Sequence, residues 1–300
     1  MEHPPHRAVA DTRERSTSTN PLELIVIPDI LSQGQYDIVY NFLSLVIASQ
    51  LFTAVFLLIS LPRVLPRYRQ AITVAIVVCG IAAYHYFRIF DSFKDAYVST
   101  TTGGMGDYVT SEASFNEGYR YVDWLLTVPL LLVELIAVLA LARAVQSSLL
   151  KRLVPAAFLM IALGYLGEIL PGDDPMRGVW GLLSSLPFLY ILFVLFVQLS
   201  KSLSIQPVGV RSKLSNLRWL LLLTWGVYPI AFILPMIGAD GADAWVGKQI
   251  GYSLADILAK CVYAIIIYQV ARIKSFDDDP KFAEVEGSHG EFVAPAVAKK

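Results

Sequence analysis

The sequence has little charge for its length. Asp, Glu, Lys and Arg make up 16% of the 300 residues, whereas 55% are hydrophobic. A soluble domain of this size needs more charged surface, so the composition favours a chain whose outer surface faces lipid. The formal net charge is only −1, so no broad basic surface indicates nucleic acid as a partner.

Cysteine is scarce as well. Cys79 and Cys261 both lie within apolar runs, which indicates packing and not a disulfide framework or a metal site. Residues 1–20 (MEHPPHRAVADTRERSTSTN) lack an apolar segment close to the start. We therefore expect no cleavable signal peptide, and the first membrane span should direct insertion. The segment from Asp277 onward is charged and rich in small residues, so we expect it to be disordered.

Long apolar runs recur along the rest of the chain. Each is about 17–25 residues long, the length that a helix needs to cross a bilayer. Sheet-like alternation is lacking, so a membrane β-barrel is not expected. The predicted fold is therefore an all-α membrane protein, a bundle of seven transmembrane helices at residues 36–62, 71–93, 117–143, 149–170, 178–203, 212–238 and 246–273.

Basic residues in the connections predict the orientation. The connections after the first, third and fifth spans hold three or more Lys or Arg each, whereas the other three hold one each: Lys94, Arg177 and Lys248. Because cytoplasmic connections carry the excess of Lys and Arg, we expect the N-terminus outside the cell membrane and the C-terminus in the cytoplasm. Three arginines in the N-terminal segment are a weaker, opposing signal.

The connection between the second and third spans has a pattern of its own. The segment from Tyr97 to Glu117 contains β-branched and aromatic runs around a Gly-rich turn, which favours a small β-hairpin on the outer side. The predicted organisation is an extracellular N-terminal tail at 1–34, a seven-helix domain at 35–274 and a cytoplasmic C-terminal tail at 275–300.

The third span contains ionisable residues, which are costly in a membrane and usually face the bundle interior as functional groups. Arg120, Asp123, Thr127 and Glu134 follow one another at spacings that place them on one helix face. Asp123 and Glu134 are about 16 Å apart along that face. This separation is too long for a shared proton but suits two stations on one proton route.

The seventh span contains Asp256 and Lys260, one helical turn apart within an apolar run. The two residues have two open interpretations. They form a simple buried ion pair, or the lysine forms a Schiff base with a carbonyl compound. A positively charged Schiff base would need compensating carboxylates, and Asp123 and Asp256 are available.

Two other spans contribute polar or aromatic residues. His85 lies in the outer half of the second span, at about the depth of Asp123. A lone histidine in a helix is more often a packing residue than a switch, and this depth strengthens the functional interpretation somewhat. In the sixth span, Trp225, Tyr228 and Phe232 form an aromatic stripe, for which packing is the ordinary explanation.

Together, these segments resemble the microbial rhodopsins. RYVDWLLTVPLLLVE (Arg120 to Glu134) is similar to the third helix of proteorhodopsins and xanthorhodopsins, and SLADILAK (Ser253 to Lys260) to their retinal-lysine helix. The resemblance covers nearly all of the chain except the two tails, through WGVYPIAF (Trp225 to Phe232), YHYFRIF (Tyr84 to Phe90), GYLGE (Gly164 to Glu168) and WGLLSSLPFLYIL (Trp180 to Leu192). Each motif alone is weak, but all occur in the expected order.

The resemblance implies a light-driven outward proton pump, which is not an enzyme. All-trans retinal would be held in the seven-helix domain as a protonated Schiff base on Lys260. Asp123 would accept the proton and, with Asp256, form the counterion, and Glu134 would be the cytoplasmic proton donor. The implied surroundings are membrane lipid and further copies of the chain in a homo-oligomer, with protons as the transported ion.

Other roles also follow from the resemblance. Arg120 would order the outer half of the pathway, and Thr127 is the middle residue of the family's three-position motif. His85 resembles the histidine that hydrogen-bonds the acceptor aspartate. Leu131 stands where proteorhodopsins carry leucine in green-absorbing forms and glutamine in blue-absorbing ones. The residues expected at the retinal are Trp124, Leu131, Tyr228, Trp225, Phe188, Tyr86, Gly181, Ser184 and Ser185.

Gly181 resembles the xanthorhodopsin branch, in which a second, carotenoid chromophore binds where related pumps carry tryptophan. Close packing of helices is the alternative reason for a glycine here. The loops PGDDPMR and GADGADAW contain no obvious pair of glutamates for proton release, so the exit group stays unassigned.

A photosensory receptor with the same chromophore is the alternative function. Such receptors resemble the pumps but usually lack the cytoplasmic carboxylate, so Glu134 argues against this alternative. A chloride or sodium pump would replace Asp123 or the Asp–Thr–Glu pattern, and neither replacement is present. A seven-helix receptor or transporter without photochemistry is the remaining alternative.

Overall fold

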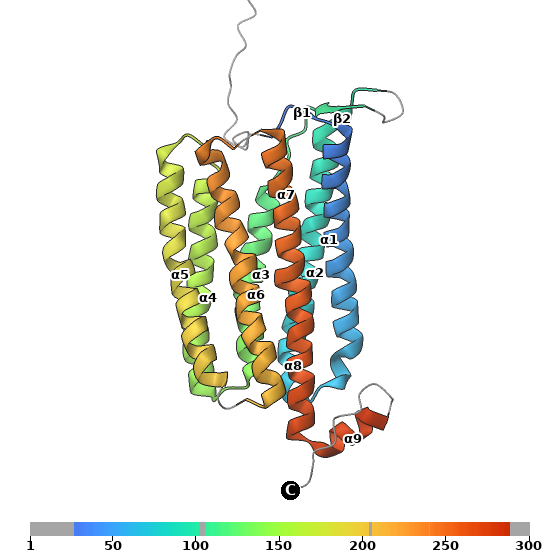
Figure 1. Ribbon diagram of the computed structural model, residues 1–300, viewed down its shortest axis with the longest axis vertical. Coiled ribbons are helices and arrows are strands. Elements are labelled where there is room, and N and C mark those ends of the chain that lie inside the picture. The colour runs from blue at the N-terminus through green and yellow to red at the C-terminus, as the bar shows by residue number, and fades with distance from the viewer. Residues whose placement is uncertain (1–26, 102–105, 204–205, 240, 289–300) are drawn as a thin grey trace, which may run out of the picture.

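The computed structural model describes residues 27–101, 106–203, 206–239 and 241–288. Seven helices in these ranges are long and apolar enough to cross a membrane, and they lie side by side along the long axis of the molecule (Figure 1). The prediction of an all-α membrane protein with seven spans is confirmed. Six spans consist mainly of one helix each: α1 (Gln33–Ser60), α2 (Pro66–Ala96), α3 (Gly118–Leu139), α4 (Arg143–Glu168), α5 (Pro175–Leu203) and α6 (Val208–Ile233). The seventh span contains two, α7 (Ala242–Asp256) and α8 (Tyr263–Asp278).

Three short helices adjoin these spans. Two are 3₁₀ helices, η1 (Leu61–Arg63) and η2 (Leu234–Ile237), at the ends of α1 and α6. The third, η3 (Ile257–Val262), is a π-helical segment between α7 and α8. Helices α7, η3 and α8 therefore form one continuous seventh span.

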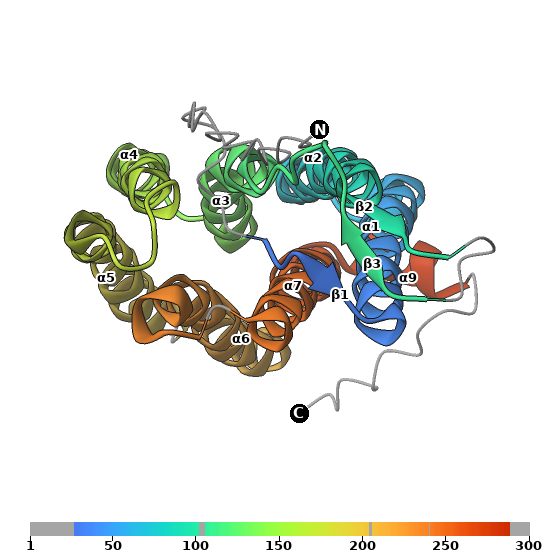
Figure 2. The ribbon, with the colours of Figure 1, turned by 90° about the horizontal axis from the view of Figure 1, so that it is seen from above.

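The seven spans form a ring when viewed along their axes (Figure 2). Each span contacts the next, and the seventh closes the ring by contacting both α1 and α6. Large apolar side chains such as Phe52 and Leu223 are exposed on the outside of this ring, where lipid is their natural environment. In the most apolar stretch of α3, 72% of the residues are buried, whereas the corresponding share is 17% in α4 and in α5. Helix α3 therefore presents most of these residues to the interior of the bundle.

A small sheet covers one end of the bundle, which we call the sheet end. Strands β2 (Tyr97–Ser99) and β3 (Tyr108–Thr110) are antiparallel, which confirms the predicted hairpin. A third strand, β1 (Ile30–Leu31), pairs with the free edge of β3. The sequence did not predict β1, which lies within the predicted N-terminal tail; residues 1–26 of that tail lie outside the described residues.

Helix α3 ends earlier than the predicted 143. Ala140 has a positive φ of 50°, which stops the helix, and Arg143 already begins α4. The ammonium of Lys274 donates hydrogen bonds to the carbonyls of Val138 (3.2 Å) and Leu139 (2.8 Å). A cation at this position satisfies carbonyls that have no partner within the helix. The other spans differ from prediction by a few residues at their ends.

The C-terminal segment is more ordered than expected. Helix α8 continues to Asp278, and α9 (Pro280–Ser288) follows it at the end of the bundle opposite the sheet. The expectation of disorder from Asp277 is therefore wrong up to Ser288. The Asp279 carboxylate accepts hydrogen bonds from the first turn of α9, at the backbone nitrogens of Lys281 and Phe282, and such a cap stabilises a helix start. Residues 289–300 lie outside the described residues.

Candidate functional site

The π-helical segment η3 places Lys260 in the interior of the ring. Its side chain is 1% exposed. The ammonium nitrogen lies 2.7 Å from Oδ2 of Asp123 and 2.9 Å from Oδ1 of Asp256. Both carboxylates are fully buried as well. The structure thus brings together one lysine and two aspartates, and a π segment inside a helix is frequent at functional sites.

The two aspartates have different surroundings. Asp256 accepts hydrogen bonds from the Tyr86 hydroxyl (2.7 Å), the Tyr228 hydroxyl (2.5 Å) and, more distantly, the Trp124 indole N–H (3.5 Å). These three donors stabilise the charge on Asp256 and fix its position. Asp123 accepts from Lys260 through Oδ2, whereas its Oδ1 has no hydrogen-bond partner in the described part of the chain. Asp123 is therefore the carboxylate with an oxygen available for a proton.

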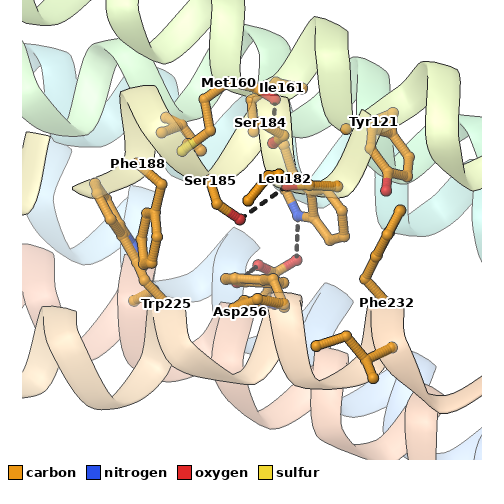
Figure 3. Close-up of a pocket in the computed structure, with 18 of the residues that line it drawn as sticks. Tyr121, Met160, Ile161, Leu182, Ser184, Ser185, Phe188, Trp225, Phe232 and Asp256 are labelled. Carbon is orange, nitrogen blue, oxygen red and sulfur yellow. Dashed lines mark hydrogen bonds between the residues drawn. The ribbon is translucent and has the colours of Figure 1, made fainter. Parts of the chain in front are cut away.

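A cavity of about 380 Å³ opens beside Lys260, between α3, α4, α5, α6 and the seventh span. Figure 3 shows Phe188 and Trp225 at one end of this cavity and Tyr121 and Phe232 at the other. Its walls are mostly aromatic and aliphatic. The sequence-predicted residues that line it are Trp124, Leu131, Phe188, Trp225, Tyr228, Gly181, Ser184, Ser185, Asp256 and Lys260. Tyr86, also predicted at the retinal, is not among the lining residues and instead contacts Asp256.

The two serines and the glycine of α5 have defined partners. The Ser184 hydroxyl donates to the Met160 carbonyl (2.7 Å) and the Ser185 hydroxyl to the Gly181 carbonyl (2.8 Å). A Cβ atom on Gly181 would lie only 2.7 Å from a ring carbon of Phe232. Gly181 thus permits close packing between α5 and Phe232, which is the alternative reason for glycine at this position.

Glu134 lies farther along α3, away from the sheet end. Its side chain is fully buried, and neither carboxyl oxygen has a hydrogen-bond partner among the described residues. A charged carboxylate would lose its hydration there without compensation, so the carboxyl is expected to keep its proton at rest. Glu134 is separated from Asp123 by about 16 Å along the helix.

The remaining predicted residues have partners other than the aspartate carboxylates, and only for His85 does this differ from the expectation. The His85 ring is hydrogen-bonded through Nδ1 to the Ile81 carbonyl of its own helix at 3.0 Å. No hydrogen bond joins His85 to Asp123 within the described ranges. The Thr127 hydroxyl donates to the backbone carbonyl of Asp123 (2.8 Å) and not to its carboxylate. Arg120 donates to the Tyr86 hydroxyl (3.0 Å) and to Gln249.

Residues 39–274 match the profile of the bacteriorhodopsin-like protein family. The chain belongs to this family. Over 230 residues it is 30% identical to the green-light absorbing proteorhodopsin of the gamma-proteobacterium EBAC31A08, and the match covers 76% of this chain and 84% of that protein.

Two solved structures are similar over most of their length. One is xanthorhodopsin, described as a light-driven ion pump with a dual chromophore, with 41% sequence identity and a TM-score of 0.79. The other is thermophilic rhodopsin, with 44% identity and a TM-score of 0.79. Each match covers 84% of this chain and 99% of the other. The resemblance to microbial rhodopsins is thereby confirmed, and these relatives are not enzymes.

Membership of the family implies a retinal chromophore held by a lysine. The residues of this chain fit such a group. The cavity volume lies within the range of ordinary ligand pockets, about 300–1,000 Å³, and its apolar walls suit a hydrocarbon chain. Among the described residues, Lys260 is the lysine that lines the cavity, and Asp123 Oδ1 is a buried acceptor without a donor.

A second buried polar cluster lies nearer the sheet end, and the sequence did not reveal it. The Lys248 ammonium bridges Glu117 and Glu168, at 2.8 Å from each, and Arg177 pairs with Glu168 at 2.9 Å. Gln249 links this cluster to Arg120, since its amide donates to Glu117 (2.6 Å). The cluster joins α3, α4, α5 and α7 by paired charges.

The electrostatics of Glu117 follow from these neighbours. Burial raises the pKa of the Glu117 carboxyl, but Lys248 and Arg120 lower it by more, so the pKa lies below its ordinary value. The Glu117 carboxyl is therefore ionised near neutral pH. In the sequence, Glu168 is the last residue of the GYLGE motif, and Arg177 and Lys248 are the single basic residues of their predicted connections. Their spacing along the chain gives no indication that they pair with one another.

Proposed function

We propose that the chain is a light-driven pump that moves protons out of the cell, with retinal bound covalently to Lys260. The observation that carries this proposal is the position of the Lys260 nitrogen, between Asp123 and Asp256 at the wall of an apolar cavity. The likeness to xanthorhodopsin, a light-driven ion pump, and to a proteorhodopsin supports it.

Retinal supplies the absorption of visible light and a change of shape that alters the contacts of the Lys260 nitrogen. Asp123 takes the proton from this nitrogen, because its Oδ1 is buried and has no donor in the part of the chain that the structure describes. Asp256 stays charged beside it, held by the hydroxyls of Tyr86 and Tyr228. One aspartate thus accepts the proton while the other fixes the geometry.

Glu134 returns a proton to the Lys260 nitrogen from the opposite side. It lies on the same helix as Asp123 and keeps its proton until the nitrogen needs one. Moving one charge against the membrane potential costs about 2.3 kcal/mol per 100 mV, so an acceptor and a donor on separate sides are required. Asp123 and Glu134 satisfy this requirement.

Outward transport needs the sheet end outside the cell. Two of the three basic residues in the connections at this end, Arg177 and Lys248, are buried and paired with glutamates. The positive charge exposed at the sheet end is therefore smaller than the sequence suggests. This supports the orientation with the sheet outside and α9 in the cytoplasm. Membrane lipid surrounds the ring, and a homo-oligomer stays a prediction.

A photosensory receptor is the competing function, and Glu134 decides between the two. In Glu134→Gln, we expect the colour to stay nearly unchanged but the return of the proton to the Lys260 nitrogen to slow by about 10²-fold or more, since a positioned acid supplies at least that factor. Flash spectroscopy of the purified pigment measures this step. The matched control is Glu284→Gln on exposed α9. A Glu134→Gln variant that recovers at the wild-type rate would remove the donor from the proposal.

A carotenoid beside Gly181 is a further proposal, supported by the dual chromophore of xanthorhodopsin. Gly181 lines the cavity, and the adjacent Leu182 is largely exposed on the lipid side of α5. After incubation with a carotenoid, light absorbed by the carotenoid should drive the photoreaction in the wild type but not in Gly181→Trp. A wild-type action spectrum without a carotenoid contribution would leave Gly181 with its packing role alone.

A further inference from the structure

Lys274 is a buried cation to which the proposed pumping cycle assigns no role. It lies on α8, 7% exposed, at the end of the bundle opposite the sheet. Its ammonium donates to the carbonyls of Val138 and Leu139 and lies 5.2 Å from the centre of the Tyr68 ring. Within the described ranges, no carboxylate lies within salt-bridge distance of it. The positive charge is thus directed at the last turn of α3.

Glu134 lies on that same helix, about 8 Å before its end. When Glu134 gives up its proton it becomes a buried anion, and neither of its oxygens has a hydrogen-bond donor in the described part of the chain. The C-terminal end of a helix carries a partial negative charge from its unpaired carbonyls. These carbonyls would oppose an anion close to the end of α3, and Lys274 counteracts them.

A polar cavity of about 280 Å³ lies next to Lys274. Since a water molecule occupies about 30 Å³ in the liquid, the cavity has room for several. The charged groups that line it besides Lys274 are Arg67, Asp277 and Asp278, and the Tyr68 hydroxyl donates to Asp278 at 2.5 Å. Arg67 pairs with Asp278 at 2.9 Å. The end of α3 therefore separates Glu134 from this polar, charged cavity, which we call the vestibule.

We propose that Lys274 is a positioning residue for the donor step: its charge stabilises the Glu134 anion that forms when the proton leaves for Lys260. The inference rests on the proposed function and adds a residue to it. In the step, the O–H bond of Glu134 breaks, an N–H bond forms at Lys260, and Glu134 becomes negative. A proton from the vestibule later restores the Glu134 O–H bond.

Two substitutions separate charge from hydrogen bonding. Lys274→Gln keeps an N–H donor for the two carbonyls but removes the charge, whereas Lys274→Arg keeps both. We expect Lys274→Gln to slow the reprotonation of Lys260 on the order of tenfold, because the Glu134 anion loses the attraction of one unit charge through a protein medium with an effective dielectric constant of about 20. Lys274→Arg should stay close to the wild type. Lys281→Gln on exposed α9 is the control.

A double-variant comparison distinguishes this role from a structural one. If Lys274 acts through Glu134, Lys274→Gln should have little further effect in a Glu134→Gln background, as flash spectroscopy can measure. An equal slowing in both backgrounds, or wild-type kinetics in Lys274→Gln, would overturn the inference. The wild type separates this inference from the proposed function. If the wild type acidifies its medium under light, failure of the Lys274 test overturns only the role of Lys274. If it does not, both the proton pump and the role of Lys274 are overturned.

Discussion

The Lys260 ammonium donates a 2.7 Å hydrogen bond to Asp123, although 137 positions separate the two residues. The second carboxylate at this nitrogen, Asp256, lies only four positions away on the same helix. The contact between Lys260 and Asp123 therefore ties α3 to the seventh span at the centre of the ring. It also places the predicted proton acceptor, Asp123, next to the Lys260 nitrogen, which is the predicted source of the proton.

Removal of the lysine tests the attachment site. Lys260→Ala should give a colourless protein after incubation with all-trans retinal, because no other lysine lines the cavity among the described residues. Lys281→Ala, on exposed α9, should form pigment like the wild type. The visible absorption spectrum measures both, and a stable visible pigment in Lys260→Ala would contradict the assignment.

Removal of the acceptor charge tests the role of Asp123. Asp123→Asn should move the absorption maximum to longer wavelength, because a negative charge that stabilises the ground-state cation is lost. It should also abolish proton transfer from the Lys260 nitrogen to the protein. Asp243→Asn in the first turn of α7, at the sheet end, should leave the maximum in place. An unshifted Asp123→Asn spectrum would mean that Asp123 is not part of the counterion.

Substitution of Leu131 tests what determines the wavelength of maximum absorption. Leu131 is almost fully buried and lines the cavity, so we expect the wild type to absorb green light. Leu131→Gln should shift the maximum toward the blue, because a polar group there stabilises the ground-state charge. Leu132 is also buried but is not a lining residue, so Leu132→Gln should have a much smaller effect. A wild-type maximum in the blue would contradict this prediction.

Substitution of His85 tests whether its side chain influences Asp123. His85 bonds its own helix in the structure, while Asp123 Oδ1 has no partner in the described part of the chain. We predict that His85→Ala moves the midpoint of the acid-induced colour change by more than about one pH unit, equivalent to about 1.4 kcal/mol. Spectral titration measures the midpoint. If it does not move, His85 is a packing residue.

Much of the site could be predicted because it follows the period of a helix. Arg120, Asp123, Thr127 and Glu134 share one face of α3 by spacing alone, and all four are buried. The seven spans follow from the length of the apolar runs. Lys260 was recognisable as an ionisable residue where none is expected.

The rest depends on contacts between helices that lie far apart in the sequence. Lys248 and Arg177 are each a single basic residue near a span end, so only the fold shows that Glu117 and Glu168 neutralise them. Lys274 is another such case, because its partners are backbone carbonyls of α3. Backbone acceptors leave no signal in the side-chain pattern.

The most direct test of the account is the external pH of illuminated, unbuffered cells that express the chain with all-trans retinal. We predict that the medium becomes more acidic in the light, and that the change disappears with a protonophore and in Asp123→Asn. A coloured wild-type protein that leaves the external pH unchanged, or makes the medium more alkaline, would contradict an outward proton pump.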